Sequence, residues 1–176
     1  ANRVIYGVGV KTGTTGAVYI SGNVTITDTS VHESMESADG IRGYAGVTLD
    51  GATVAIDLAA DDVAIGIWAD ADEAPIVIQN NSSVHITTLQ DWKAATMPNT
   101  TQAYSMGLGT WAGDILIEDS TVDIDISAYR LGIGAWIRNT NVNRGVGNID
   151  ILDSDVDIDA KVNGANTITT QSVGMY

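Results

Sequence analysis

The chain contains no cysteine, which excludes a disulfide framework and any metal site built from thiolates. It also lacks phenylalanine and has only two prolines, whereas valine, isoleucine and threonine are plentiful, a composition typical of β-strands. Basic residues are scarce, with 8 lysines and arginines against 22 acidic residues and a net charge of −14. Without a basic stripe, nucleic acid and anionic membranes are poor partners.

Long hydrophobic runs are missing as well. The best apolar run, residues 63–69, has seven residues, far short of the roughly 18 that a membrane-spanning helix needs. We therefore expect no transmembrane segment in this chain. With 176 residues, of which 44% are hydrophobic and 17% charged, the chain is long enough to bury a sizeable core and is not expected to be disordered.

What the sequence does contain is a repeat. One template recurs five times: an apolar-x-apolar strand, a turn rich in Gly, Asn, Asp and Ser, and a second strand that reads Val-x-Ile. The second strands of the five copies begin at Val24, Val54, Val84, Val122 and Val156. A third strand with a central glycine precedes each copy, at Gly7, Gly40, Gly66, Gly107 and Gly132.

Three strands recurring in one order predict an all-β fold, a triangular parallel β-helix of about five coils of three strands each. The connections that follow the Val-x-Ile strand alternate between long and short, so we expect long loops at one corner. A β-sandwich is the alternative, but it gives no reason for the same order to recur five times. Residues 1–176 show no linker or composition change, which indicates a single domain.

Strand alternation predicts which side chains leave the core. If Ile65 and Ile67 point inward, then Gly66 and Trp68 point outward. The same alternation predicts a flat strip of glycines bordered by aromatic side chains, and sugar rings stack on such faces. The candidate carbohydrate-binding residues are Tyr44, Trp68, Trp111, Trp136 and Tyr176. The alternative interpretation is that these aromatic side chains pack on one another or lie beneath nearby loops.

A second candidate site is acidic. With Val122 and Ile124 inward, Asp123 and Asp125 face outward, and Asp157 and Asp159 do the same in the next coil. Like charges on adjacent strands repel each other, and a bound Ca²⁺ would relieve that repulsion because it accepts several carboxylate oxygens. The alternative is a solvated acidic face that keeps an exposed sheet soluble, so no cofactor is required.

We expect no catalytic residues. The only two histidines, His32 and His85, are far apart in the sequence. A nucleophilic triad needs a base close to a serine, and Ser105 and Ser127 are ordinary strand-end residues. Paired carboxylates, which glycosidases use, are too numerous here to single out a pair.

The spacing of glycine in Tyr6-Gly7-Val8-Gly9-Val10, Ala38-Asp39-Gly40-Ile41 and Asp50-Gly51-Ala52-Thr53-Val54 resembles that of autotransporter passenger domains. The resemblance covers essentially the whole chain and implies a right-handed parallel β-helix with an adhesin-like role. It also implies an extracellular location at the bacterial cell surface. The chain is similar at the same coarse level to β-helical polysaccharide lyases, which implies a basic residue beside calcium-binding carboxylates; only Arg130 lies near Asp123 in the sequence.

Our leading hypothesis is a non-catalytic surface module that presents a binding face for adhesion or carbohydrate recognition. Its partner would be a host or environmental glycan or a surface protein. The alternative is a calcium-dependent polysaccharide lyase or glycosidase. Only Met175 and Tyr176 follow Gly174, so we expect the chain to be a segment of a longer surface protein or to associate with itself end to end.

Overall fold

The protein is built from β-strands. The computed structural model describes residues 3–10, 16–28, 35–90, 104–129, 131–138, 147–162 and 171–175, without the side chains of residues 3–6, 8–10, 35, 36 and 171–173. These parts of the chain form sixteen strands and no helix, so they hold no helix that could cross a membrane. The strands are β1 (Arg3–Val10), β2 (Val18–Ile20), β3 (Asn23–Asp28), β4 (Met35–Gly43), β5 (Val47–Asp50), β6 (Thr53–Ala60), β7 (Val63–Asp72), β8 (Ile76–Gln79), β9 (Ser83–Gln90), β10 (Tyr104–Trp111), β11 (Ile115–Glu118), β12 (Thr121–Ala128), β13 (Leu131–Ile137), β14 (Ile149–Leu152), β15 (Asp155–Val162) and β16 (Gln171–Met175).

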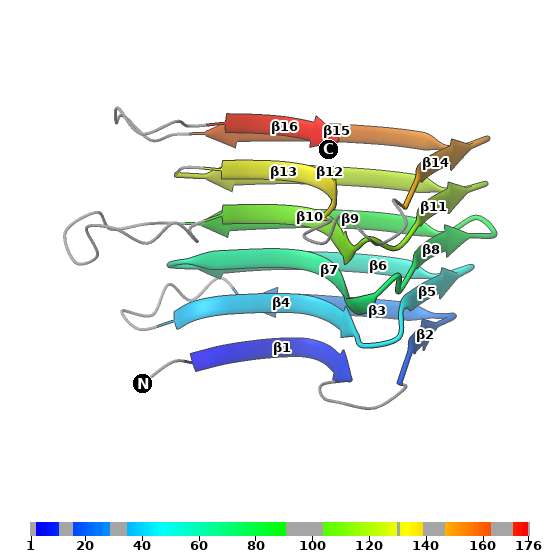
Figure 1. Ribbon diagram of the computed structural model, residues 1–176, viewed down its shortest axis with the longest axis horizontal. Helices are drawn as coiled ribbons and strands as arrows, with labels where there is room; N and C mark the ends of the chain where they lie inside the picture. Colours follow the sequence, from blue (N-terminus) through cyan, green and yellow to red (C-terminus); the bar gives the residue numbers. More distant parts are fainter. Residues whose placement is uncertain are drawn as a thin grey trace.

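Every third strand joins the same sheet, so the chain winds around one axis (Figure 1). Sheet A has the order β1-β4-β7-β10-β13-β16, sheet B the order β2-β5-β8-β11-β14, and sheet C the order β3-β6-β9-β12-β15. All neighbouring strands are parallel. The prediction of an all-β parallel solenoid is confirmed.

The number of turns is smaller than the repeat count suggested. Sheets B and C each hold five strands, which are separated by four intervals, so the solenoid makes about four turns rather than the five coils that we predicted. Strand β16 adds a sixth strand to sheet A alone. The number of repeats exceeds the number of turns, because the first and the last strand of a sheet each have a neighbour on one side only.

The connections between strands differ in length from corner to corner. Long connections follow β3, β9 and β15 and lead from sheet C to sheet A, whereas short ones follow β6 and β12. This is the one corner at which we predicted long loops. Long connections also lead from sheet A to sheet B after β1 and β13, which the repeat pattern did not indicate.

The core consists of columns of identical or similar side chains that run along the axis. In sheet C the register aligns the five valines of the repeat, Val24, Val54, Val84, Val122 and Val156, as predicted. The isoleucines two residues later form a second column, in which Ile56, Ile86 and Ile124 are at most 1% exposed. Each such fully buried side chain contributes roughly 1.5–3 kcal/mol relative to an exposed one.

The central glycines of sheet A face this core, and our prediction that they point outward is wrong. A Cβ atom on Gly66 would lie 2.5 Å from Cγ2 of Ile86, and one on Gly107 would lie 2.6 Å from Cγ2 of Ile124. The glycines therefore leave room for the isoleucines of sheet C. In the next coil the equivalent residue is Gly134, whose Cβ would meet Ile158, and not Gly132 as the repeat alignment suggested.

The alternation of sheet A changes at the glycine. Ile67 lies in the main core, but Ile65 belongs to a separate cluster outside it, although both were predicted to point inward. Between them, Gly66 also faces the core, so two consecutive residues, Gly66 and Ile67, are directed to the same side. A glycine permits this because it has no side chain to place.

The corner between sheets B and C is held by a ladder of serine hydroxyl groups. Oγ of Ser82 accepts a hydrogen bond from the amide of Ala52, Oγ of Ser120 accepts one from the amide of Ser82, and Oγ of Ser154 accepts one from the amide of Ser120. Each hydroxyl donates to a carbonyl of its own coil. Amide groups that the turn would leave unpaired are satisfied in this way.

The inward position of the glycines can be tested with one methyl group. Gly107→Ala places a Cβ 2.6 Å from both the carbonyl oxygen of Gly134 and Cγ2 of Ile124, so we expect a loss of about 1–3 kcal/mol in the free energy of unfolding. Gly22→Ala is the matched control, because no heavy atom lies within 4 Å of its Cβ position. Urea unfolding of both variants measures the difference; equal stability would contradict the inward orientation.

Candidate functional site

The outer face of sheet A carries a hydrophobic cluster of its own, here called the outer cluster. Its buried members are Ile65, Trp68, Met106 and Ile133, and Val63, Tyr104, Trp111, Leu131 and Trp136 are packed around them and partly buried. The register of β7, β10 and β13 aligns Ile65 with Met106 and Ile133. Because these three strands are adjacent and parallel, their outward side chains form one continuous surface.

The aromatic side chains of this cluster contact one another edge to face. The rings of Trp68 and Trp111 are 5.5 Å apart between centroids, and those of Tyr104 and Trp136 are 6.2 Å apart. Gly109 pairs with both Trp68 and Trp136 across the neighbouring strands. A Cβ there would lie 2.5 Å from the Trp68 ring, so this outward glycine lets the indole lie directly on the backbone.

The five aromatic residues predicted to bind carbohydrate have different outcomes. The structure brings Trp68, Trp111 and Trp136 together in the outer cluster, but Trp68 is only 4% exposed and cannot offer a face to a ligand. Trp111 and Trp136 remain partly exposed. Tyr44 is also partly exposed and is not part of the outer cluster, and Tyr176 lies outside the described residues.

Tyr104 was missed by the sequence analysis. The alternation that placed Ile65 and Ile67 inward in β7 would place Tyr104 and Met106 inward in β10, whereas both belong to the outer cluster. Their shared position follows from the change of alternation at Gly107. An alignment of the start of β10 with the start of β7, in which Tyr104 pairs with Val63, would have indicated that Tyr104 belongs to the same face.

An ion triad borders the outer cluster. Arg42 donates from its guanidinium to the carboxylates of Asp39 and Asp70, with an N–O distance of 2.8 Å to each, and Nε1 of Trp68 donates to Asp70 over 3.0 Å. Burial alone would raise the pKa of Asp70, but the hydrogen bonds from Trp68 and Arg42 outweigh it and lower that pKa. Burial likewise opposes the charge of Arg42, yet its bonds to Asp70 and Asp39 raise its pKa.

A second guanidinium lies on the aromatic rings themselves. The Cζ atom of Arg138, directly after β13, is 4.7 Å from the ring centroid of Trp111 and 5.1 Å from that of Trp136. Both distances are within the range of a cation–π interaction. The outer cluster therefore combines two indole rings and one cation at its partly exposed side.

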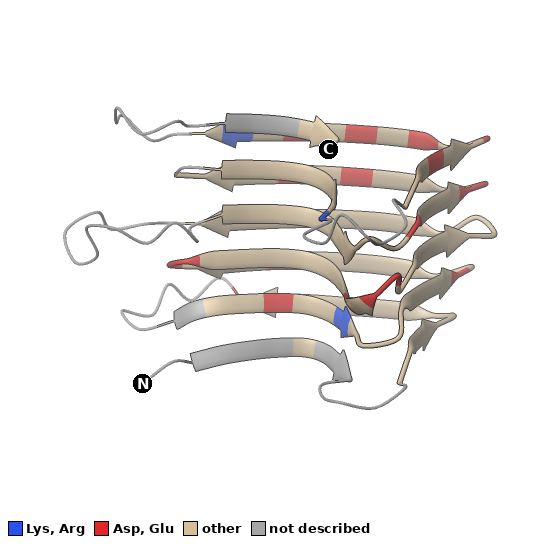
Figure 2. Cartoon of the chain, viewed as in Figure 1, with Lys and Arg blue, Asp and Glu red and all other residues tan. Residues whose placement is uncertain are grey.

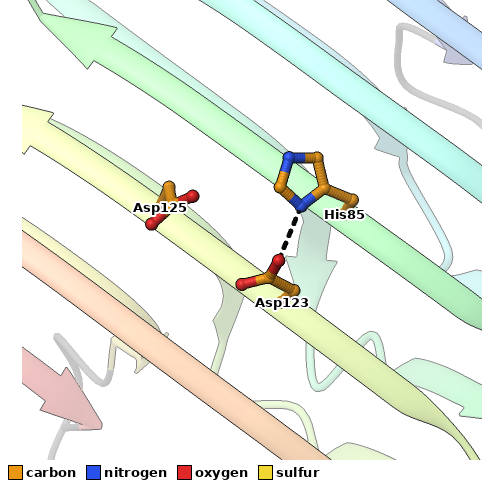
Figure 3. Close-up of side chains that lie close together, drawn as sticks. All are labelled: His85, Asp123 and Asp125. Atoms are coloured by element: carbon orange, nitrogen blue, oxygen red, sulfur yellow. Dashed lines mark hydrogen bonds and ion pairs between the residues drawn. The ribbon is translucent and has the colours of Figure 1, made fainter.

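The acidic face of sheet C has the predicted register. Asp123 pairs with Asp157 and Asp125 with Asp159, and Figure 2 shows acidic bands on both β12 and β15. The structure adds His85 of β9, whose Nδ1 lies 2.9 Å from Oδ2 of Asp123 (Figure 3). An alignment of Val84-His85-Ile86 with Val122-Asp123-Ile124 places His85 next to Asp123, but we did not infer this contact from the sequence.

His85, Asp123 and Asp125 each offer one ligand atom, and these atoms lie within 4.8 Å of one another. Asp157 and Asp159 do not belong to this group, and Asp159 forms an ion pair with Lys161. All three side chains of the group are exposed. A divalent cation that bound here would have one imidazole and two carboxylate ligands, a donor set closer to the preference of Zn²⁺ than of Ca²⁺.

The arrangement expected of a lyase is a basic residue beside two carboxylates. Among the described residues Arg42 lies next to Asp39 and Asp70, and Lys161 pairs with Asp159 and also interacts with the charge of Asp125. A guanidinium between two carboxylates stays protonated, so it cannot accept a proton from a substrate. Arg130 and His32 lie outside the described residues. No family model, no curated protein and no solved structure matches this chain.

Calcium binding at sheet C is testable by thermal melting. If Ca²⁺ binds at Asp123 and Asp125, millimolar calcium raises the melting temperature, because the ion stabilises only the folded state. Asp125→Asn should reduce the rise, and Asp157→Asn, outside the group, should leave it unchanged. A larger rise with zinc that His85→Ala abolishes would identify the imidazole as a ligand. No rise with either ion would contradict a cation site and favour a solvated acidic face.

Proposed function

We propose that the protein is a non-catalytic binding module that recognises carbohydrate on the outer face of sheet A. The observation that carries this proposal is the outer cluster, in which Trp111 and Trp136 remain partly exposed on a buried platform. Aromatic rings present apolar faces that match the apolar faces of pyranose rings. Exposed aromatic surface is costly in water unless a partner covers it.

The platform beneath the two indoles supports this use. Met106 is fully buried and Ile65, Trp68 and Ile133 are at most 5% exposed, so the rings above them rest on close-packed side chains. Their edge-to-face contacts with Trp68 and Tyr104 fix the ring planes further. A site that is rigid before binding loses less conformational entropy when the ligand arrives.

We further propose that the module acts outside the cell, on a bacterial surface, as the similarity to autotransporter passengers implies. A right-handed coil and an adhesin-like role belong to the same proposal. The net charge of −14 disfavours nucleic acid and anionic membranes as partners, which leaves glycans and surface proteins. A solenoid suits adhesion because its sides are long and flat and its core does not depend on the residues that face outward.

A glycan array tests the carbohydrate proposal. We expect the purified chain to bind one group of related glycans, and Trp136→Ala to reduce binding at least about fivefold, since a stacked aromatic side chain contributes about 1–3 kcal/mol. Tyr19→Ala is the matched control, because Tyr19 is an aromatic residue of sheet B that is 62% exposed. Thermal melting confirms that both variants fold. No binding, or equal loss in both variants, would contradict the proposal.

The outermost strands β14, β15 and β16 support a second proposal, end-to-end self-association of the chain through this face. Strands β14, β15 and β16 are the last of their sheets, and Ile151, Leu152 and Met175 near this end are 36%, 48% and 45% exposed. Their outer backbone edges offer a template for another strand. Light scattering over a concentration series should show a rising mass, and Ile151→Lys should suppress it. A constant monomer mass would contradict this second proposal.

A further inference from the structure

Arg138 differs from the other basic side chains that the structure describes. These are Arg42, Arg138 and Lys161, since the side chains of the remaining lysines and arginines are outside the description. Arg42 and Lys161 each form ion pairs with aspartates. Arg138 is positioned by a hydrogen bond from its backbone amide to the carbonyl of Thr110, and its guanidinium stacks on Trp111 and Trp136.

Among the described residues, Arg138 contacts two aromatic rings and pairs with no carboxylate, although the protein is strongly acidic. The chain has 22 acidic and 8 basic residues, so a carboxylate partner would be easy to supply. Two of the aspartates near the outer cluster, Asp39 and Asp70, are both held by Arg42 at 2.8 Å. Their carboxylates are therefore already engaged by another guanidinium.

Tyr104 shows that the charge of Arg138 reaches the cluster. Burial raises the pKa of its hydroxyl, and the charges of Asp39 and Asp62 raise it further, whereas the charges of Arg138 and Arg42 act to lower it. The hydroxyl group therefore lies within the electrostatic reach of both guanidinium groups. Trp111, Trp136, Arg138 and Tyr104 thus form one compact set of ring faces and donors.

We propose that this set binds a sugar that carries a carboxylate, such as a uronic acid, with Arg138 donating to the carboxylate and the exposed indole surface of Trp111 and Trp136 contacting the pyranose ring. This inference rests on the proposed carbohydrate binding and specifies its ligand class. A guanidinium pairs with a carboxylate through two parallel N–H···O bonds, and stacking on the indoles leaves its planar edge free to donate.

The overall negative charge does not prevent such binding. At physiological ionic strength charges are screened beyond about 8 Å, so the carboxylate of a ligand responds mainly to the groups next to it. The acidic face formed by Asp123, Asp125, Asp157 and Asp159 belongs to sheet C, a different side of the solenoid. At the outer cluster the two aspartates beside Arg42 are already paired.

The test compares two oligosaccharides that differ only in the group at C6. Cellopentaose is neutral, and the β-1,4-linked pentamer of glucuronic acid carries a carboxylate on each ring. Titration calorimetry with the intact chain should show at least about tenfold tighter binding of the acidic pentamer. Arg138→Gln should abolish this preference, so that the variant binds the two pentamers with equal affinity.

Two further variants separate a specific guanidinium–carboxylate pair from a general effect of net charge. Lys161→Gln changes the net charge by the same amount on sheet C and should keep the preference. Arg138→Lys retains the charge but loses the planar pair of donors, so it should keep only part of the preference.

The measured affinities distinguish a failure of this inference from a failure of the proposed function. Equal affinity for both pentamers, or a preference that survives Arg138→Gln, would overturn the role of Arg138 while carbohydrate binding stands. If neither these pentamers nor any glycan of the array binds the chain, carbohydrate binding itself fails.

Discussion

The parallel pairing of each strand with its counterpart one turn earlier is the constraint on which the rest of the structure depends. The register brings the same repeat position of successive coils side by side, so a residue of an inner coil lies between the residues at that position in the coils above and below. An apolar position therefore extends into a buried column, and a polar position extends into a surface stripe. A substitution in one copy of the repeat therefore changes one residue of a column to which every coil contributes.

This constraint also explains why glycine recurs in sheet A. The isoleucine column of sheet C projects across the narrow core, and Ile86 and Ile124 reach the backbone of Gly66 and Gly107. A side chain at those positions would force the two sheets apart, and close-packed interiors tolerate such insertions poorly. The core therefore requires glycine at these positions. The same glycines also allow the inward and outward alternation of side chains to change along the strand.

Much of the fold could be predicted from the sequence for a physical reason. A Val-x-Ile strand has a period of two residues, and one face of it must be buried, so Val122 and Ile124 could be assigned to the core from their spacing alone. The recurrence of the same strand order then implied parallel stacking. The count of turns was less accurate, because strands at the ends of a stack look the same in sequence as those within it.

The orientation of residues in sheet A was harder to predict, because a glycine gives no indication of which side of the strand it faces. The pattern around Gly66 fits an outward glycine between inward neighbours. It fits an inward glycine at a change of alternation equally well. Only the distance from Ile86 decides between them, and the omission of Tyr104 follows from this ambiguity.

The residues around Asp123 on sheet C could have been predicted more completely from the sequence. Once the copies of Val-x-Ile are aligned, the residue between valine and isoleucine is His85 in one coil and Asp123 in the next, and parallel pairing makes them neighbours. A surface site in a solenoid is therefore read across the copies of a repeat at one position, and not along the chain. The outer cluster is likewise distinct from the main core, so substitutions on an outward face leave the core columns intact. Outward side chains such as Trp136 and Arg138 can then change without a cost in the stability that the buried columns provide.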